Sequence, residues 1–136
     1  MADREVVFDA EPLVAYYWDE PGADAVQSVV DDIESGRIDA AISPVTCTEV
    51  QYVAGRDDPD RAAAYVERIR HWSTIVPAEA VWADAAAFKR DYAVALGDAF
   101  TLATAAERNG TALVGADGEF EGVPVDVERI RETRIE

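Results

Sequence analysis

Val6-Val7-Phe8-Asp9, close to the start of the chain, is a short apolar run that ends in an acid. Its length and its branched and aromatic residues are typical of a buried β-strand. Similar short runs follow at residues 40–42, 74–76 and 112–114, and segments with helical spacing of apolar residues separate them. Strands that alternate with helices predict an α/β fold. We expect a mostly parallel sheet of four to five strands with helices on both faces.

Capping residues mark several of the predicted helices. Ser43-Pro44 and Asp58-Pro59 each place a capping side chain before a proline that suits the first helical turn. Asn109-Gly110 is a typical helix stop. We predict helices over residues 12–19, 23–35, 44–54, 58–72, 79–93 and 98–108, and an edge strand over residues 123–127. Because the sequence has no repeat and no linker, we expect residues 1–136 to form one domain.

The composition indicates a soluble, cytoplasmic protein. Apolar residues make up 49% of the 136 residues. No apolar run approaches the roughly 20 residues that cross a bilayer, and the N-terminal sequence lacks the features of a signal peptide, so we expect no membrane partner. Cys47 and His71 are the only residues of their types, which excludes an intrachain disulfide and a structural zinc site.

The chain is strongly acidic, with a formal net charge of −16 and Lys89 as its only lysine. At ordinary salt such a charge destabilises a small domain by self-repulsion, whereas at ~1 M salt the screening length falls to about 3 Å. We therefore expect a halophilic host, and an acidic mesophilic protein is the alternative. The same charge disfavours non-specific binding to nucleic acid, so RNA contacts would need local arginines or bridging metal ions.

Four acids occupy matching positions relative to the predicted elements. Asp9 and Asp117 follow predicted strands, whereas Glu49 and Asp98 are expected in the first turns of helices. In a parallel sheet these positions share the carboxyl edge, where the clefts of α/β proteins lie. Four carboxylates in one cleft repel each other, and Mg²⁺ or Mn²⁺ would relieve the repulsion and activate a water toward a phosphodiester. Taken singly, each acid is equally well explained as a helix cap.

Four segments that carry these acids point to a known family. They are Val6-Val7-Phe8-Asp9-Ala10; Ile42-Ser43-Pro44-Val45-Thr46 leading to Glu49; Leu96-Gly97-Asp98-Ala99 with Thr101; and Ala112-Leu113-Val114-Gly115-Ala116-Asp117-Gly118-Glu119. In this order and spacing, they resemble the PIN-domain ribonuclease family, and most of all its VapC-type toxins. The resemblance spans nearly the whole chain. It implies a three-layer α/β/α sandwich and Mg²⁺- or Mn²⁺-dependent cleavage of single-stranded or loop RNA.

The resemblance also assigns roles to individual residues. The catalytic acids and metal ligands of the family would be Asp9, Glu49, Asp98 and Asp117. Glu119 matches a further acidic position of some members and would hold a metal-bound water. Thr46 and Thr101 lie one helical turn from Glu49 and Asp98, and they would orient those carboxylates.

Two positions depart from the family pattern. Gly115 stands where members often carry Ser or Thr, which puts support for a water or a metal ligand in doubt. Glu11 adds an acid beside Asp9, and the sequence leaves open whether it joins the site.

VapC-type toxins generally form homodimers, and a VapB-type antitoxin silences them. The aromatic run Tyr16-Tyr17-Trp18 fits a helix with an interface face. Candidate contacts to RNA or antitoxin are Arg56, Arg61, Arg68 and Arg90. Two alternatives stay open: a PIN-fold protein-binding module without catalysis, and an RNA-maturation nuclease without an antitoxin. A signalling receiver domain is disfavoured because its chemistry needs a lysine at a strand end, and Lys89 lies in a helical stretch.

Overall fold

In the computed structural model, which describes residues 4–116 and 120–131, five strands form one sheet. The strands are β1 (Glu5–Phe8), β2 (Asp39–Ile42), β3 (Thr74–Ile75), β4 (Thr111–Val114) and β5 (Val127–Arg129). Their order is β3-β2-β1-β4-β5, and every neighbouring pair is parallel. The chain therefore builds outward in both directions from the β1/β4 boundary. In sheets of this kind the functional cleft lies beyond the carboxyl ends of the strands at that boundary.

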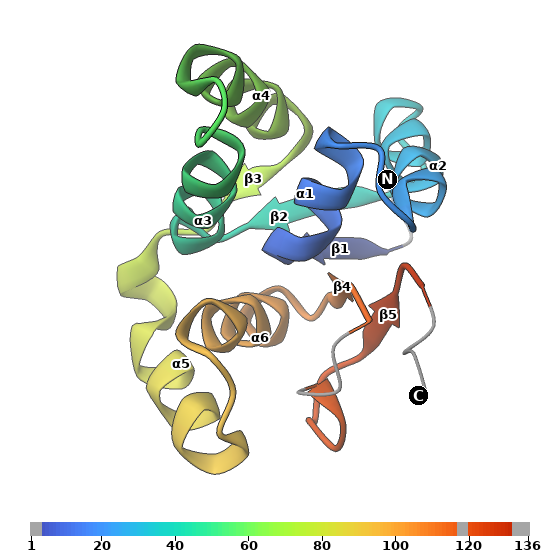
Figure 1. The fold of residues 1–136 in the computed structure, drawn as a ribbon. Helices are drawn as coiled ribbons and strands as arrows, with labels where there is room; N and C mark the ends of the chain where they lie inside the picture. Colours follow the sequence, from blue (N-terminus) through green and yellow to red (C-terminus); the bar gives the residue numbers. More distant parts are fainter. Residues whose placement is uncertain (1–3, 117–119, 132–136) are drawn as a thin grey trace, which may run out of the picture.

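Helices cover both faces of the sheet. They are α1 (Ala10–Tyr17), α2 (Ala23–Glu34), α3 (Pro44–Ala54), α4 (Pro59–Trp72), α5 (Ala78–Tyr92) and α6 (Leu96–Arg108). Figure 1 shows α1 to α4 on one side of the sheet and α5 with α6 on the other. The strand side chains alternate accordingly: Val6 and Phe8 join the core under α1 to α4, whereas Val7 packs with Leu102 of α6. The predicted α/β/α sandwich is confirmed.

The predicted capping residues start α3 and α4. The Ser43 side chain accepts a hydrogen bond from the Val45 N–H at 3.1 Å, and the Asp58 side chain accepts one from the Arg61 N–H at 3.1 Å. Asn109 ends α6 in the left-handed conformation, with φ of 52°. These local signals fix where the chain enters and leaves the helices that carry the candidate site.

Three predicted elements have boundaries that differ from the structure by two residues or more. The edge strand is Val127–Arg129, and residues 123–126 precede it as turn and extended chain. Pro124 lacks the N–H that a sheet ladder uses, so pairing with β4 begins only where Asp126 accepts from the Ala112 N–H at 2.9 Å. Helix α1 begins and ends two residues earlier than predicted, and α6 begins two residues earlier. A proline at the third helical position is compatible with α1, because the first N–H groups of a helix have no intrahelical partner.

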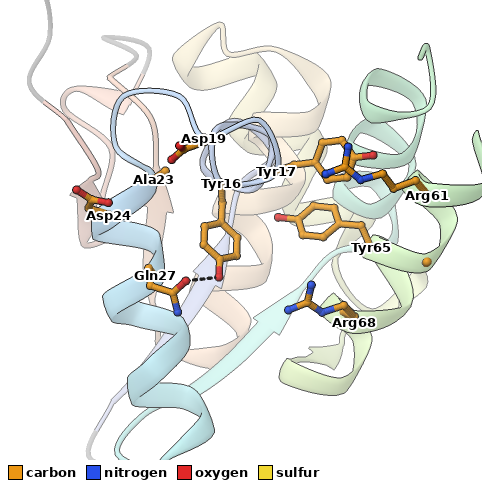
Figure 2. Close-up of a pocket in the computed structure, with 10 residues that line it drawn as sticks. Tyr16, Tyr17, Asp19, Ala23, Asp24, Gln27, Arg61, Tyr65 and Arg68 are labelled. Atoms are coloured by element: carbon orange, nitrogen blue, oxygen red, sulfur yellow. Dashed lines mark hydrogen bonds between the residues drawn. The ribbon is translucent and has the colours of Figure 1, made fainter. Parts of the chain in front are cut away.

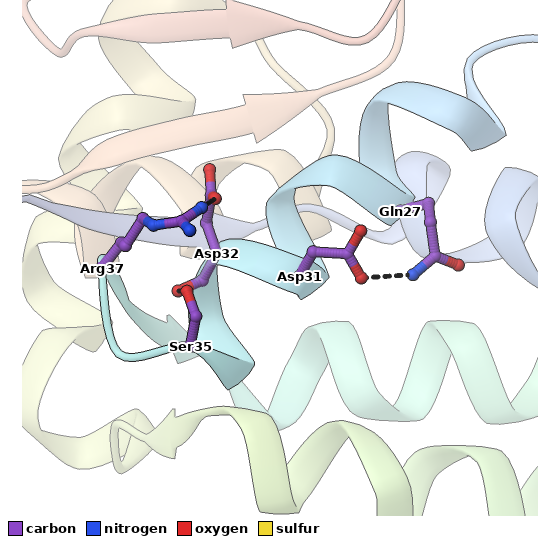
Figure 3. Close-up of polar contacts among 5 residues, drawn as sticks. All are labelled: Gln27, Asp31, Asp32, Ser35 and Arg37. Carbon is purple, nitrogen blue, oxygen red and sulfur yellow. Dashed lines mark hydrogen bonds and ion pairs between the residues drawn. The ribbon is translucent and has the colours of Figure 1, made fainter.

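The end of α2 is a polar turn at the amino edge of the sheet. Figure 3 shows the ion pair between Arg37 Nη1 and Asp32 Oδ1, at 2.9 Å, and the hydrogen bond from Gln27 Nε2 to Asp31 Oδ1, also at 2.9 Å. Acids in the last turn of a helix oppose its dipole. Arg37 partly offsets that cost as the chain turns into β2. No helix in the described ranges has the length and apolar character needed to cross a membrane.

Candidate active site

Asp9 lies at the centre of the carboxyl edge, directly after β1. It is only 4% exposed, and its backbone N–H donates to Leu113 O of the neighbouring strand β4 at 2.9 Å. Its side chain accepts a hydrogen bond from Thr101 Oγ1 of α6 at 2.8 Å. Thr101 is itself fully buried. A strand end and a helix from the opposite face therefore hold one carboxylate between them.

Asp98, in the first turn of α6, meets Asp9 in space. Burial raises the pKa of Asp9, whereas hydrogen bonds to Thr101, to the Ala10 N–H and to the Asp98 side chain lower that pKa. A hydrogen bond between two carboxyl groups requires a proton on one of them. The closeness of two acids and the burial of Asp9 both favour a proton on the pair, and a bound cation would act in the opposite direction.

Glu49 reaches the same pair from α3. It lies in the second turn of that helix, so its predicted place in the first turn is wrong. Its carboxylate lies against the Cα of Gly97, and a Cβ at position 97 would overlap Glu49 Oε1. Burial raises the pKa of Glu49, and the charge of Asp9 raises it further. The absence of a side chain at Gly97 thus lets Glu49 approach the start of α6.

The remaining predicted acids are not described. Asp117 and Glu119 lie outside the described residues, so the structure reports nothing on their positions. Among residues 4–116 and 120–131, no three Asp, Glu, His or Cys side chains form a group that could hold a metal ion. The described part of the site is the Asp9–Asp98 carboxyl pair, which Glu49 approaches from α3. These are hard oxygen donors, and their chemistry suits Mg²⁺ or Mn²⁺ rather than zinc.

The two threonines differ in their surroundings. Thr101 was predicted to orient Asp98, but its hydroxyl lies 2.8 Å from Asp9 Oδ1 and 3.3 Å from Gly97 O, so the carboxylate that it holds is that of Asp9. Thr46 is fully buried one turn before Glu49, and its hydroxyl has no hydrogen-bond partner among the described residues.

The Glu11 side chain lies directly against Gly115 at the edge of the site. The Glu11 carboxylate lies where a Cβ of residue 115 would be. It also forms an ion pair with Arg131, which follows β5 at the same carboxyl edge. A cleft of about 640 Å³ extends beside them, and its wall includes Glu11, Glu49 and Arg131. The sequence analysis did not identify Arg131, because 120 positions separate it from Glu11 and no local motif marks it.

A second cavity, of about 470 Å³, lies between α1, α2 and α4. Figure 2 shows Tyr16, Tyr17 and Tyr65 along it, with Arg61 and Arg68 entering from α4. The Arg61 guanidinium lies 4.6 Å from the centre of the Tyr17 ring. This cavity places two of the four predicted arginines next to the aromatic run that the sequence analysis associated with an interface.

The other two predicted arginines lie elsewhere. Arg56 follows α3 and lies over the Tyr52 ring, 5.1 Å from its centre. Arg90 is on α5, on the other face of the sheet, and it pairs with Asp91 at 3.0 Å. The four arginines therefore do not form one basic surface.

A comparison with protein families matches residues 6–125 to the family described as "PIN domain". No curated protein matches the sequence. Among solved structures, a chain of a toxin–antitoxin complex from Klebsiella pneumoniae is 22% identical with a TM-score of 0.72, and the match covers 93% of this chain and 98% of that one. A chain of DNA-bound VapBC from Salmonella typhimurium is 18% identical with a TM-score of 0.67, covering 94% and 99%. A chain of VapBC2 from Rickettsia felis, bound to a promoter DNA fragment, is 13% identical with a TM-score of 0.67, covering 92% and 98%.

Proposed function

This chain belongs to the PIN domain family, and on that premise we propose that it is a metal-dependent endoribonuclease, the toxin of a toxin–antitoxin pair. The proposed reaction is hydrolysis of RNA phosphodiester bonds at the carboxyl edge of the sheet. The proposed ligands of Mg²⁺ or Mn²⁺, and the proposed catalytic residues, are Asp9, Glu49, Asp98 and Asp117. The shared fold with chains of VapBC complexes supports the toxin assignment.

The observation that carries the proposal is the approach of three carboxyl groups at the carboxyl edge: Asp9 is 4% exposed, Asp98 lies beside it, and Glu49 lies against Gly97. Burying carboxyl groups together is unfavourable for folding, because each ionised group loses hydration and repels the next. A bound dication would offset that cost, because it attracts the ionised carboxylates. The arrangement therefore suits a site that is completed by a hard cation.

The residues of the chain position the reacting groups. When bound, the metal ion would polarise a phosphoryl oxygen and increase the acidity of a water. Thr101 holds the Oδ1 atom of Asp9, which leaves Oδ2 for other partners. Gly97 lets Glu49 approach, and α6 fixes Asp98 next to Asp9. Glu119 and Thr46 stay proposed supporting residues.

The substitution Asp98→Asn tests the nuclease proposal. It keeps the shape of the side chain but removes the charge that a metal ligand needs, so we expect cleavage of cellular RNA with Mn²⁺ to be abolished. The matched control is Asp84→Asn, which removes the same charge from an exposed position on α5. Wild-type cleavage rates in the Asp98→Asn protein, with Asp84→Asn unaffected, would show that Asp98 is not a ligand.

We further propose that a VapB-type antitoxin binds in the cavity between α1, α2 and α4, and that the protein is a homodimer. Aromatic rings with two arginines suit a segment that is apolar with acidic side chains. Arg61→Ala together with Arg68→Ala should weaken capture of the antitoxin encoded next to this gene, whereas Arg90→Ala should not. Equal binding by both variants would contradict the assignment of this cavity.

A catalytically inactive PIN-fold binding module is the second candidate. It is favoured by one observation: Gly115 stands where family members often carry Ser or Thr, and the Glu11 carboxylate fills the space that such a side chain would take. Calorimetric titration with Mn²⁺ separates the two. Heat from stoichiometric binding that Asp9→Asn removes supports the nuclease, and no uptake of metal supports the binding module.

A further inference from the structure

The cleft beside the candidate site contains one basic side chain among its described lining residues, that of Arg131. Its acidic lining residues are Glu11, Glu20 and Glu49. A polyanion that enters this cleft meets repulsion from these acids and from a chain with a net charge of −16. Among the described lining residues, Arg131 is therefore the side chain that would attract a nucleic-acid substrate into this cleft.

Three structural features hold Arg131 in place. Ile130 is 8% exposed, and its N–H donates to Val114 O at 3.0 Å, which continues the pairing of β5 with β4 up to the cleft. The Arg131 guanidinium pairs with Glu11 through Nη2 and lies 3.4 Å from Pro21 O through Nη1. Glu11 in turn is positioned by the space that Gly115 leaves open. Strand, helix start and glycine together fix the direction of this side chain.

A guanidinium has five N–H donors in a planar fork, and these two contacts involve only part of that set. The side chain is 34% exposed and lines the cleft, so part of it can be reached by a molecule that enters there. A planar fork with free donors matches the oxygens of a phosphodiester. An Arg131–Glu11 ion pair that only stabilised the fold would not need to lie on the wall of the cleft, which Glu49 also lines.

We propose that Arg131 binds a backbone phosphate of the RNA in this cleft, next to the phosphodiester presented to Asp9, Glu49 and Asp98. Glu11 is then a positioning residue for Arg131, and this explains why an additional acid stands beside Asp9. The inference rests on the proposed function, since it names the residue that holds the substrate of that same site.

The test compares Arg131→Gln with Arg37→Gln. Both changes remove one positive charge and one ion pair with an acid, and the two acids are equally exposed, at 41%. Arg37 lies between α2 and the start of β2, at the amino edge of the sheet, and does not line the cleft. Binding of a fluorescent single-stranded RNA is measured by anisotropy with Mn²⁺ over a series of KCl concentrations. The Asp98→Asn background keeps the RNA intact, and KM and kcat are measured separately in the otherwise wild-type protein.

We expect Arg131→Gln to weaken RNA binding about tenfold and to raise KM with little change in kcat, which is the loss of one charged hydrogen bond. The slope of log affinity against log salt should fall by ~0.7, the value for one phosphate contact on a single strand. Arg37→Gln should change neither quantity. Arg131→Lys keeps the charge without the fork and should fall between the wild type and Arg131→Gln.

The outcomes separate this inference from the proposed function. Equal binding and equal salt slopes for Arg131→Gln and Arg37→Gln, in a protein that cleaves RNA, would overturn the role of Arg131 alone. A wild type that binds RNA without cutting it would overturn the nuclease proposal, and the comparison of the two variants would still decide on Arg131. A protein that neither binds nor cuts RNA would overturn both. Far-ultraviolet circular dichroism of each variant verifies that the fold is retained.

Discussion

At the scale of single residues, Asp9 shows how a functional carboxyl group opposes folding. Burial raises its pKa, and only hydrogen bonds from Thr101, Ala10 and Asp98 act in the other direction. Asp9 therefore holds its proton to a higher pH in the folded chain than in the unfolded chain. Glu49 shifts in the same direction, for reasons of burial and of the nearby Asp9 charge. The fold keeps both groups although the metal-free protein would be more stable without their charges.

The pH dependence of stability tests this. A raised folded pKa means that the native state keeps protons which the unfolded state has lost, so stability falls as pH rises. The loss begins near 3.8, the ordinary value for Asp9, and is complete above the raised folded pKa. In chelator and at constant salt, denaturant unfolding should show wild type losing stability relative to Asp9→Asn from acid to neutral pH. Mn²⁺ should remove that difference, and a wild type that gains on the variant would contradict the pKa direction.

A substitution at Gly97 should change the activity of the site without lowering the stability of the fold. The substitution Gly97→Ala would push the Glu49 carboxylate away from α6, because the new Cβ overlaps its oxygen. The displaced group is the end of a flexible side chain, and alanine suits a helix better than glycine by about 1 kcal/mol. We expect thermal stability to stay the same or rise, while RNA cleavage falls about a hundredfold. Unchanged cleavage would show that the position of Glu49 does not matter for the reaction.

At the scale of elements, two helices from opposite faces of the sheet create the site. Helix α3 brings Glu49 and helix α6 brings Asp98, and they meet over the end of β1. Caps define where such helices start and thus which residues face the cleft. The same holds for α4, whose N-terminal cap precedes the turns that carry Arg61 and Arg68.

The cap of α4 gives a prediction at this scale. Asp58→Ala removes the acceptor of the Arg61 N–H and should lower the free energy of unfolding by ~1 kcal/mol. Asp57→Ala removes the same charge from the exposed preceding residue and should change it by less than about 0.5 kcal/mol. Denaturant unfolding in concentrated KCl measures both. Equal effects would mean that charge, rather than capping, determines the stability of this helix start.

At the scale of the whole molecule, charge dominates. Six ion pairs link the described side chains, and most of their members are exposed, so each contributes little to stability. Because the sequence has 28 acids and only 12 lysines and arginines, most of the acids cannot each have a cation of their own. Long-range repulsion among these acids acts on the whole fold and is removed only by salt or bound cations.

Salt should therefore stabilise the protein over a wide range. We expect the melting temperature to rise from dilute buffer to ~1 M KCl, where the screening length is about 3 Å. The rise should be as large in Asp9→Asn as in wild type, because it comes from the whole surface and not from the metal site. A protein that is equally stable in dilute buffer would favour the mesophilic alternative and contradict a halophilic one.

Local signals predicted most of the fold. Alternating strands and helices indicated the sandwich, and the capping residues Ser43 and Asp58 were recognised from their proline neighbours. The last strand was placed too early, because residues 123–127 are apolar enough for a strand while Pro124 prevents pairing. Glu49 was predicted in the first turn of its helix. Because α3 begins at Pro44, directly after the correctly predicted cap Ser43, Glu49 lies in the second turn.

The sequence by itself determined the order of the elements, the donor chemistry of the acids and the net charge, because each depends on residue identity and on near neighbours. Only the tertiary structure decided which side chains meet: Thr101 with Asp9, Glu49 with Gly97, and Glu11 with Arg131. These partners are separated by 92, roughly 50 and 120 positions. Contacts over such separations depend on strand order and helix packing, which no local pattern in the chain encodes.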